Sequence, residues 1–386
     1  MVGLPRSSSP VEREVAARIE RYGPLPFDEV VELALYDPEH GFYQRGGSAG
    51  RRGDFITSPE VGPLFGAVLA SALDCWWDEL GQPDPFVVVE CGAGVGTLAL
   101  TIRAAAPRCL HVLTYVLVER SEALRAHQGD HLELTPPQLA LPPARGLDTG
   151  MAGEGRTGPC FVSLAELPTL TVQGVVLANE LLDNLPFRLL QLGVGGWEEV
   201  RVGLGADGGL TEVLVPAEAA HAELAARLAP QAPVGGRIPL QLAAVSWLRQ
   251  VLALVERGRV VVFDYAAMTA ELARRPKDSW LRTFRGHERG GPPLSDLGSQ
   301  DITCDVAIDQ LARVRPPSSV RTQAEFLRAH GIEALVEEGR RIWHERAAIG
   351  DLEALRGRSR VREAEALLDP SGLGTFDVLE WRLPGF

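Results

Sequence analysis

Two groups of acidic residues in this sequence have neighbours that could shape a binding site for a cationic ligand. The first lies in FVVVECGAGVGTLAL, residues 86–100, where four β-prone apolar residues lead into Glu90. The alternate glycines Gly92, Gly94 and Gly96 follow, and then residues that suit a helix. This pattern predicts a strand, a tight turn and a helix, an arrangement that brings the backbone close to a nucleotide-like ligand.

The spacing of the glycines separates two classes of such ligands. Dinucleotide-binding turns have the pattern G-x-G-x-x-G, whereas here the third glycine comes one position earlier and Thr97 follows it. Glu90 would repel a pyrophosphate, but it would attract a ligand that carries an amino group and a sulfonium. Glu119 ends the next predicted strand and could bind a ribose diol, which NAD and S-adenosyl-L-methionine share. The glycine spacing and Glu90 therefore favour S-adenosyl-L-methionine.

The second acidic group lies in LANELLDNLPF, residues 177–187. This segment contains both asparagines of the chain, Asn179 and Asn184, with Glu180 and Asp183 between them. A helical turn would place the two carboxylates on one face, three residues apart. Such a pair suits a guanidinium, whose planar fork of donors is matched by carboxylates. The alternative is a capped, solvated helix start with two ordinary acids.

These side chains would be positioned by strands that alternate with helices along the chain. The predicted strands cover residues 86–90, His111–Glu119, Cys160–Leu164, 172–179 and Arg259–Tyr265. Their alternation with helices predicts an α/β fold with a doubly wound, mainly parallel sheet. The segment TFDVLEWRL, residues 375–383, predicts a further strand at the edge of that sheet.

Two amphipathic helices are expected before the first strand of the sheet, at Val11–Tyr22 and Phe27–Tyr36. A polar, glycine-rich loop follows them. At its end, Ser58 is predicted to be the N-cap of a long helix, with Pro59 in the first helical position and the helix continuing through Trp77.

Length, net charge and the distribution of apolar residues limit the number of domains and the kinds of partner that we expect. The chain of 386 residues has 45% hydrophobic residues and a formal net charge of −13. That length favours two or so domains, or one large domain with additions. The charge is spread along the sequence, so we expect no nucleic acid partner. No segment approaches about 18 uninterrupted apolar residues, so we expect no membrane insertion.

The distribution of the cysteines indicates the kind of cellular compartment in which the protein functions. All five are scattered and none forms a C-x-x-C pair, which argues against a disulfide framework and a structural zinc site. The start of the sequence contains no apolar core of the signal-peptide kind. A reducing compartment is therefore implied, and we expect a cytoplasmic protein with no metal in its site.

Nine segments together resemble the MidA family of S-adenosylmethionine-dependent methyltransferases. The mitochondrial member of that family is a protein arginine methyltransferase that assists respiratory complex I assembly. The segments, in the family's order, are GFYQRGG, GDFITSPEVGPLFG, VVVECGAGVGTLA, VLVERSEALRAHQ, VVLANELLDNLPFR, VVVFDYA, LRTFRGH, QDITCDV and TQAEFL. They cover roughly residues 10 to 382, and GDFITSPE followed by NELLDNLP is the most specific combination.

The resemblance implies a class I, Rossmann-like fold: a doubly wound, seven-stranded methyltransferase sheet with an N-terminal helical extension and an insertion after the fourth strand. Residues 1–80 would form the extension and an active-site loop. Residues 81–386 would form the S-adenosylmethionine-binding domain, with inserted, substrate-facing regions at about 187–258 and 277–318. The resemblance also implies that the loop carrying Asp54, Thr57 and Ser58 folds over the cofactor.

Roles can then be assigned to the candidate residues. Glu90 and Glu119 would hold the amino-acid and ribose parts of the cofactor, and the three glycines would let the backbone approach it. Asn179, Glu180 and Asp183 would hold the methyl acceptor. The resemblance favours a protein arginine as acceptor, with a respiratory-complex subunit as one candidate, and the N-terminal helices would allow a homodimer. Two alternatives stay open: a small-molecule methyltransferase, and a cofactor-binding assembly or scaffold protein with little turnover.

Overall fold

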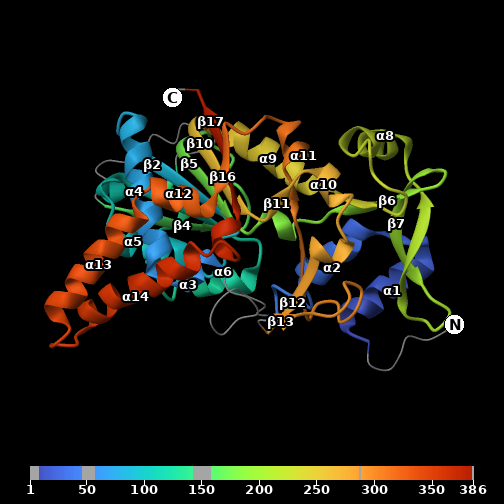
Figure 1. The fold of residues 1–386 in the computed structure, drawn as a ribbon, viewed down its shortest axis with the longest axis horizontal. Helices are drawn as coiled ribbons and strands as arrows, with labels where there is room; N and C mark the ends of the chain where they lie inside the picture. The colour runs from blue at the N-terminus through green and yellow to red at the C-terminus, as the bar shows by residue number, and fades with distance from the viewer. Residues whose placement is uncertain (1–7, 46–56, 142–157, 287, 385–386) are drawn as a thin grey trace.

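A seven-stranded sheet forms the centre of one half of the protein (Figure 1). The computed structural model describes residues 8–45, 57–141, 158–286 and 288–384. Across the sheet the order is β16 (Ser319–Thr322), β17 (Asp377–Leu383), β10 (Val255–Asp264), β5 (Val172–Asn179), β2 (Phe86–Cys91), β3 (Leu113–Val118) and β4 (Cys160–Leu164). The five strands from β10 to β4 are parallel, and β16 and β17 are antiparallel to their neighbours.

The chain changes direction across this sheet between β2 and β5. It runs from β2 outward to β3 and β4, and then returns to β5 and continues outward to β10 on the other side. Open α/β sheets bind ligands at such a switch point, beyond the carboxyl ends of the strands. The predicted doubly wound sheet is therefore confirmed. The late strand β17 lies one place in from the edge, because the short strand β16 pairs with its outer side.

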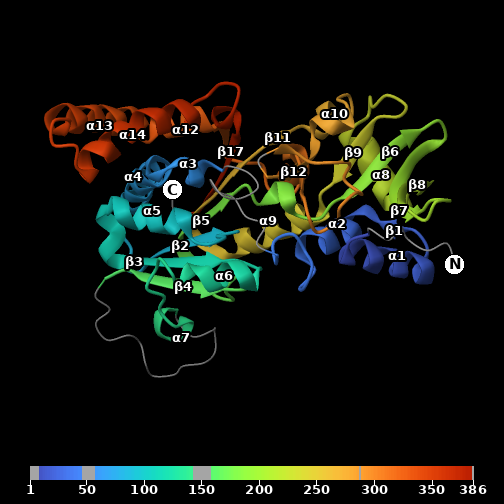
Figure 2. The same cartoon turned by 90° about the horizontal axis from the view of Figure 1, so that it is seen from below.

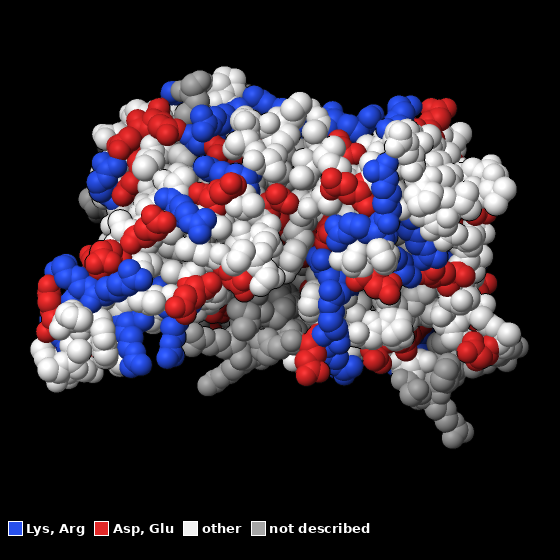
Figure 3. Space-filling view, in the orientation of Figure 1, with Lys and Arg blue, Asp and Glu red and all other residues white. Residues whose placement is uncertain are grey.

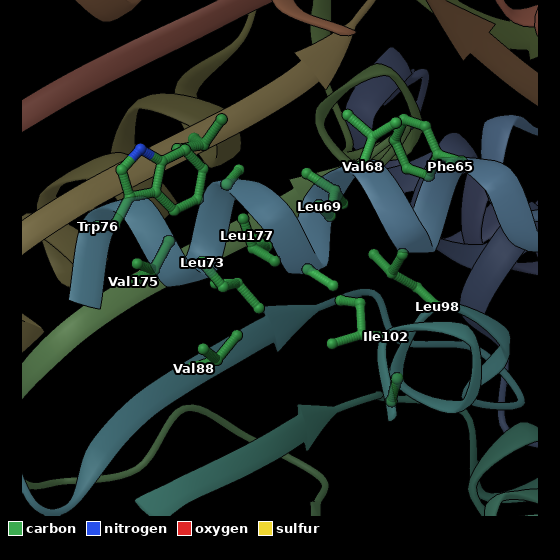
Figure 4. Close-up of a cluster of buried hydrophobic side chains, with 14 of the residues drawn as sticks. Phe65, Val68, Leu69, Leu73, Trp76, Val88, Leu98, Ile102, Val175 and Leu177 are labelled. Atoms are coloured by element: carbon green, nitrogen blue, oxygen red, sulfur yellow. The ribbon is translucent and has the colours of Figure 1, made fainter. Parts of the chain in front are cut away.

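Helices cover both faces of the sheet, which explains why all six residues of β2 are buried. On one face, α4 (Pro63–Glu79) and α5 (Thr97–Ala105) pack on β2 and β5 (Figure 4). Gly66 lets the two helices approach, because a Cβ atom there would lie 2.1 Å from Oγ1 of Thr101. On the other face, α9 (Leu242–Leu254) packs through Leu248 and Val251.

The other half of the protein contains the insertion that follows β5, the fourth strand along the chain in the large sheet, as predicted. It forms a sheet of β6 (Arg188–Gly193), β7 (Gly196–Leu204), β8 (Leu210–Pro216) and β9 (Arg237–Leu240), with α8 (Ala219–Leu228) against it. The N-terminal helices α1 (Pro10–Tyr22) and α2 (Phe27–Tyr36), with the two-residue strand β1 (Leu25–Pro26), pack on this sheet.

A three-stranded sheet completes this half. It consists of β12 (Leu281–Arg285), β13 (Glu288–Arg289) and β14 (Asp301–Cys304). Val31 of α2, Val200 of β7 and Ile302 of β14 belong to one buried cluster. The N-terminal extension therefore shares its core with the insertion and with β14, whereas α4 belongs to the core of the large sheet.

The remaining helices are short or lie at the periphery. They are α3 (Ser58–Val61), α6 (Glu122–Gln128), α7 (Pro137–Ala140), α10 (Thr269–Leu272), α11 (Ile308–Ala312), α12 (Gln323–Ala329), α13 (Ile332–Arg346) and α14 (Leu352–Leu367); the short strands β11 (Ala266–Ala267) and β15 (Val306–Ala307) pair with each other. Helices α13 and α14 form a hairpin that projects beside the large sheet (Figure 2). None of the helices that the structure describes has the length and apolar character needed to cross a bilayer.

Charged side chains of both signs are mixed on the face seen in Figure 3. Lys and Arg gather near α10 and β12, and many of them have acidic partners. Lys277 pairs with Glu212 at 2.9 Å, for example, and Arg285 pairs with Asp296 at 3.4 Å.

The prediction that Ser58 caps one long helix is wrong. The N-cap of α3 is Thr57, and Gly62 separates α3 from α4. A residue distant in the sequence caps the first turn of α4: the Glu363 carboxylate of α14 accepts a hydrogen bond from the Leu64 amide at 2.9 Å. A side chain at position 62 would collide with that carboxylate. The Ser58 hydroxyl is buried and donates to Oε1 of Gln323 at 2.8 Å.

Candidate active site

A cavity of about 250 Å³ lies at the switch point of the large sheet. The segments that follow β2, β3 and β5 form its floor. Tyr36 and Tyr43 line it from the N-terminal part of the chain, Thr57 from the start of α3, and Trp247 from α9. Its position agrees with the general location of ligand sites in open α/β sheets.

The glycine turn shapes one wall of this cavity. Gly92, Gly94 and Gly96 have φ values of 73°, 52° and 86°, which L side chains rarely adopt. An added Cβ atom at Gly94 would meet nothing within 4 Å, so this backbone faces open space in the cavity wall. Gly96 does not line the cavity; a Cβ there would lie 3.1 Å from Leu117, so this glycine lets α5 start close to β3.

Glu119 joins the glycine turn to the end of β3. Its Oε2 accepts a hydrogen bond from the Gly94 amide at 2.9 Å, and its Oε1 accepts one from the Ser121 amide at 2.8 Å. Burial raises the pKa of this carboxyl, although the backbone hydrogen bonds act in the opposite direction. Glu119 therefore lines the cavity and also holds the turn in shape.

Glu90 is a buried acid in the same wall, with a relative exposure of 5%. The Tyr115 hydroxyl donates to its Oε2 at 2.8 Å. Burial raises the pKa of Glu90 to about 8, because the charged form has lost its water. A cation in the cavity would favour the ionised form of this residue.

The turn after β5 forms the opposite part of the cavity. Asn179 and Glu180 line it, and the Glu180 amide donates to the Phe263 carbonyl at 2.8 Å, which extends the pairing of β5 with β10. Glu180 has a φ of 50°, in the left-handed region, and the 3₁₀ turn begins only at Leu182. The predicted helical turn from Glu180 to Asp183 is therefore not formed.

The carboxylates of Glu180 and Asp183 still influence each other. Burial, followed by the charge of Asp183, raises the pKa of Glu180 to about 8, while hydrogen bonds from Asn179 and the Ser58 backbone lower it. Asp183 has a relative exposure of 3% and lies behind the cavity wall rather than in it. Burial and the charges of Asp264 and Asp301 raise its pKa. Its Oδ1 has no hydrogen-bond partner among the described residues.

The predicted site residues thus occupy three positions. Thr57, Glu90, Gly92, Gly94, Glu119, Asn179 and Glu180 line the cavity. Ser58, Gly96 and Asp183 lie behind its wall, and Asp54 lies outside the described residues. Within the part of the chain that the structure describes, no group of three or more His, Cys, Asp or Glu side chains could hold a metal ion.

Sequence reasoning did not single out four further residues near the cavity. Tyr36 and Tyr43 line it with stacked rings 5.6 Å apart, and Asp264 and Asp301 are fully buried behind the turn after β5. Asp264 could have been predicted from the sequence, because it is an acid at the end of an apolar strand. Tyr43 and Asp301 lie in the segments GFYQRGG and QDITCDV, which carried the family resemblance without an assigned role.

The cavity suits S-adenosylmethionine in both shape and charge. The glycine turn leaves room for a ligand against the backbone, and two acids, Glu90 and Glu119, lie beside it. Buried carboxylates without a cationic partner are costly, and a ligand with an ammonium and a sulfonium would offset that cost.

Comparison with known proteins decides the family. A family model described as "Putative S-adenosyl-L-methionine-dependent methyltransferase" matches residues 68–324. The chain belongs to this family, the MidA family. Protein arginine methyltransferase NDUFAF7 homolog, mitochondrial, of Drosophila melanogaster is 30% identical over 76% of this chain and 67% of its own length. Protein arginine methyltransferase NDUFAF7, mitochondrial, of Mus musculus is 28% identical over 79% of this chain and 70% of its own length.

A solved structure agrees with this assignment. A Burkholderia thailandensis protein crystallised with S-adenosyl-homocysteine has a TM-score of 0.76 and 27% identity, with 98% of this chain and 95% of the other covered. This member of the MidA family is therefore a class I methyltransferase with a Rossmann-like fold, and S-adenosylmethionine is its methyl donor.

The expectation of a cytoplasmic protein is contradicted by these relatives, which are mitochondrial. That expectation depended on unpaired cysteines and on a start without an apolar core. Both features are compatible with any reducing compartment, so they do not distinguish the cytoplasm from the interior of a mitochondrion.

Proposed function

We propose that this methyltransferase modifies arginine side chains of a protein, that Asn179 and Glu180 hold the guanidinium in the cavity, and that Asp183 supports Glu180 from behind the cavity wall. One observation carries the proposal: Glu180 lines the cofactor cavity as an acid of raised pKa, with the carboxylate of Asp183 close behind it. A guanidinium keeps its charge at any physiological pH and therefore offsets the repulsion between these acids. The names of the relatives support the same acceptor.

We assign the cofactor to the glycine-turn side of the cavity. Glu90 would contact the amino group of the cofactor and Glu119 its ribose hydroxyls, with Gly92 and Gly94 against it and Gly96 behind the turn. Thr57 lines the same cavity from the start of α3. The bound donor supplies an electrophilic methyl group on a positively charged sulfur.

The residues of this chain would supply alignment and electrostatics. Glu180 would accept hydrogen bonds from the guanidinium and hold one nitrogen in line with the methyl group. Asn179 donates to Oε1 of Glu180 at 3.1 Å and so restricts the rotation of that carboxylate. A carboxylate with a pKa of about 8 can also take the proton that the product guanidinium releases.

The test is methyl transfer from radiolabelled S-adenosylmethionine to a peptide library with a fixed central arginine. A matched library with lysine at the same position is the control. We expect label only in the arginine library, and mass spectrometry should place the methyl group on the guanidinium. Transfer to lysine instead, or transfer to neither library by protein that binds the cofactor, would overturn the proposal.

A further inference from the structure

One buried oxygen atom, Oδ1 of Asp301, joins three parts of the chain. It accepts hydrogen bonds from Nδ2 of Asn184 at 2.9 Å, from the hydroxyl of Tyr43 at 3.2 Å and from the Ile302 amide at 2.9 Å. Asn184 belongs to the turn after β5, Tyr43 follows the N-terminal helices, and Ile302 is in β14. Asp301 has a relative exposure of 0%.

Two of these three donors line the cavity, whereas Asp301 does not. Asn184 receives a further bond through its carbonyl, to which the Tyr36 hydroxyl donates at 3.2 Å. The side chain and the main chain of Asn184 are thus both bonded to groups from outside its own turn. Tyr36 and Tyr43 stack on each other, so the N-terminal extension and the turn form one continuous wall.

A second buried carboxylate holds the same turn in a different way. Oδ2 of Asp264 accepts hydrogen bonds from the amides of Leu182 and Asp183, at 3.0 and 3.3 Å. These bonds fix the backbone of the turn relative to β10. They do not connect it to the N-terminal extension. The side chain of Asn184 is held by Asp301 and by the Ile302 carbonyl, to which its Nδ2 also donates at 3.2 Å. The two tyrosines are connected to Asn184 through Asp301 and through the Asn184 carbonyl.

We propose that Asp301 is a positioning residue for methyl transfer. It holds Asn184 and Tyr43 in place on the side of the cavity formed by the turn after β5 and the N-terminal extension, which we call the acceptor side. It acts through these two residues without touching the cofactor or the acceptor. The inference rests on the proposed function, because it takes the acceptor to bind beside Glu180.

The conservative variant Asp301→Asn keeps an oxygen that can accept all three bonds, whereas Asp301→Ala removes it. We expect Asp301→Ala to lower kcat about 10- to 100-fold, because displacement of positioning groups by an ångström is enough for such a loss. The Kd for S-adenosylmethionine should stay within about twofold, since the acid does not line the cavity. Asp301→Asn should recover most of the kcat.

The experiment compares these two variants in peptide methylation and in calorimetric titration with S-adenosylmethionine. Asp309→Ala is the matched control, because the Asp309 carboxylate accepts two hydrogen bonds from Thr269 and does not line the cavity. It should lower the thermal midpoint and leave kcat unchanged. Wild-type kcat in Asp301→Ala, or an equal loss in Asp301→Asn, would overturn the positioning role.

Hydrogen exchange separates failure of this inference from failure of the proposed function. If the wild-type protein methylates no arginine peptide, the proposed function is overturned, and exchange still tests the role of Asp301. Faster exchange confined to residues 36–45 and 179–185 in Asp301→Ala, restored in Asp301→Asn, would support it. Unchanged exchange in both segments, or a uniform rise across the protein, would overturn it.

Discussion

The two sides of the cavity are constructed differently. The glycine-turn side comes from the neighbouring strands β2 and β3 and the residues directly after them, and Glu119 joins these two segments by accepting a hydrogen bond from the Gly94 amide. The acceptor side combines the N-terminal extension, the turn after β5, and β14. Local sequence determines the first side, whereas tertiary contacts determine the second.

The two sides of the cavity also differ in the source of the hydrogen bonds to their buried polar groups. On the glycine-turn side, the ladder between parallel strands places Glu90, and the Glu119 amide continues the ladder of β3 by donating to the Leu164 carbonyl. Any doubly wound sheet would supply such bonds. On the acceptor side, the buried carboxylates of Asp264 and Asp301 each accept two hydrogen bonds from distant segments. A change on one side should therefore leave the other intact, and variants can test that separation.

The largest effect is expected for Glu180→Gln. Loss of the negative charge should lower kcat/KM for an arginine peptide about 100- to 1,000-fold, because an unpaired guanidinium would be left in a desolvated site. The Kd for S-adenosylmethionine should change little. Peptide methylation and calorimetry measure the two quantities. The control is Glu166→Gln, which replaces an exposed acid whose neighbours line the cavity and should behave as wild type. A parallel loss of cofactor affinity in Glu180→Gln would contradict the separation of the two sides.

The pH dependence of the same reaction sharpens this prediction. With a pKa of about 8, Glu180 is mostly protonated at pH 7 and ionises as the pH rises. At saturating cofactor, kcat/KM for the peptide should therefore increase about tenfold between pH 7 and pH 9. Glu180→Gln should have a flat profile over that range. A wild-type profile without this rise would show that ionised Glu180 does not limit acceptor binding.

On the glycine-turn side, Glu119→Ala should weaken S-adenosylmethionine binding about 100-fold, since the variant loses the carboxylate that lines the cavity and its hydrogen bonds from the Gly94 amide of the glycine turn and from the Ser121 amide. Calorimetry with the cofactor tests this, with NADH as a ligand that should not bind either protein. Glu122→Ala, an exposed residue three positions along, is the control and should bind normally. Unchanged affinity in Glu119→Ala would remove Glu119 from the cofactor site.

The same contrast explains what could be predicted from the sequence. The succession of strands and helices along the chain, the glycine turn and the acids at the ends of β2 and β3 follow from local pattern, because strand, turn and helix each have a short-range signature. The N-terminal helices were also predicted, and α2 has the predicted bounds, Phe27–Tyr36.

The acceptor side could be predicted only in part. Asn179 and Glu180 were expected in the site, but local spacing suggested a helical turn, and pairing with β10 instead extends the chain to Glu180. Ser58 was assigned to a cap because its neighbours suit one, while a distant carboxylate, Glu363, bonds the first turn of α4. No local pattern indicates that Asp301 meets Tyr43, because that contact spans 258 residues.

A different quantity, the stability of the cofactor-free protein, depends on the buried acid Glu90. Because burial raises its pKa from 4.5 to about 8, its contribution to stability is full below the unfolded pKa and is lost as the pH rises through about 8. Glu90→Gln cannot ionise, so at pH 8.5 its free energy of unfolding should exceed that of wild type by roughly 4 kcal/mol. At pH 5 the two proteins should be similar.

Urea unfolding at the two pH values measures this difference, and Glu122→Gln is the exposed control. The same variant should bind S-adenosylmethionine more weakly, because the carboxylate that a cation would stabilise is gone. Equal stability at pH 8.5 would mean that the ionised Glu90 is already satisfied within the cofactor-free protein.

The smallest effect is expected for the tyrosines that connect the N-terminal extension to the acceptor side. Tyr43→Phe removes one neutral donor from Asp301 and keeps the stacked ring, so kcat should fall only about fivefold. Tyr36→Phe, which loses its bond to the Asn184 carbonyl, is the matched variant. The two bonds end on Asn184 and on Asp301, which are hydrogen-bonded to each other. Because the bonds belong to one network, the double variant should lose less than the product of the two single effects. Fully multiplicative losses in peptide methylation would show that the two tyrosines act independently, and that the wall they form is not one unit.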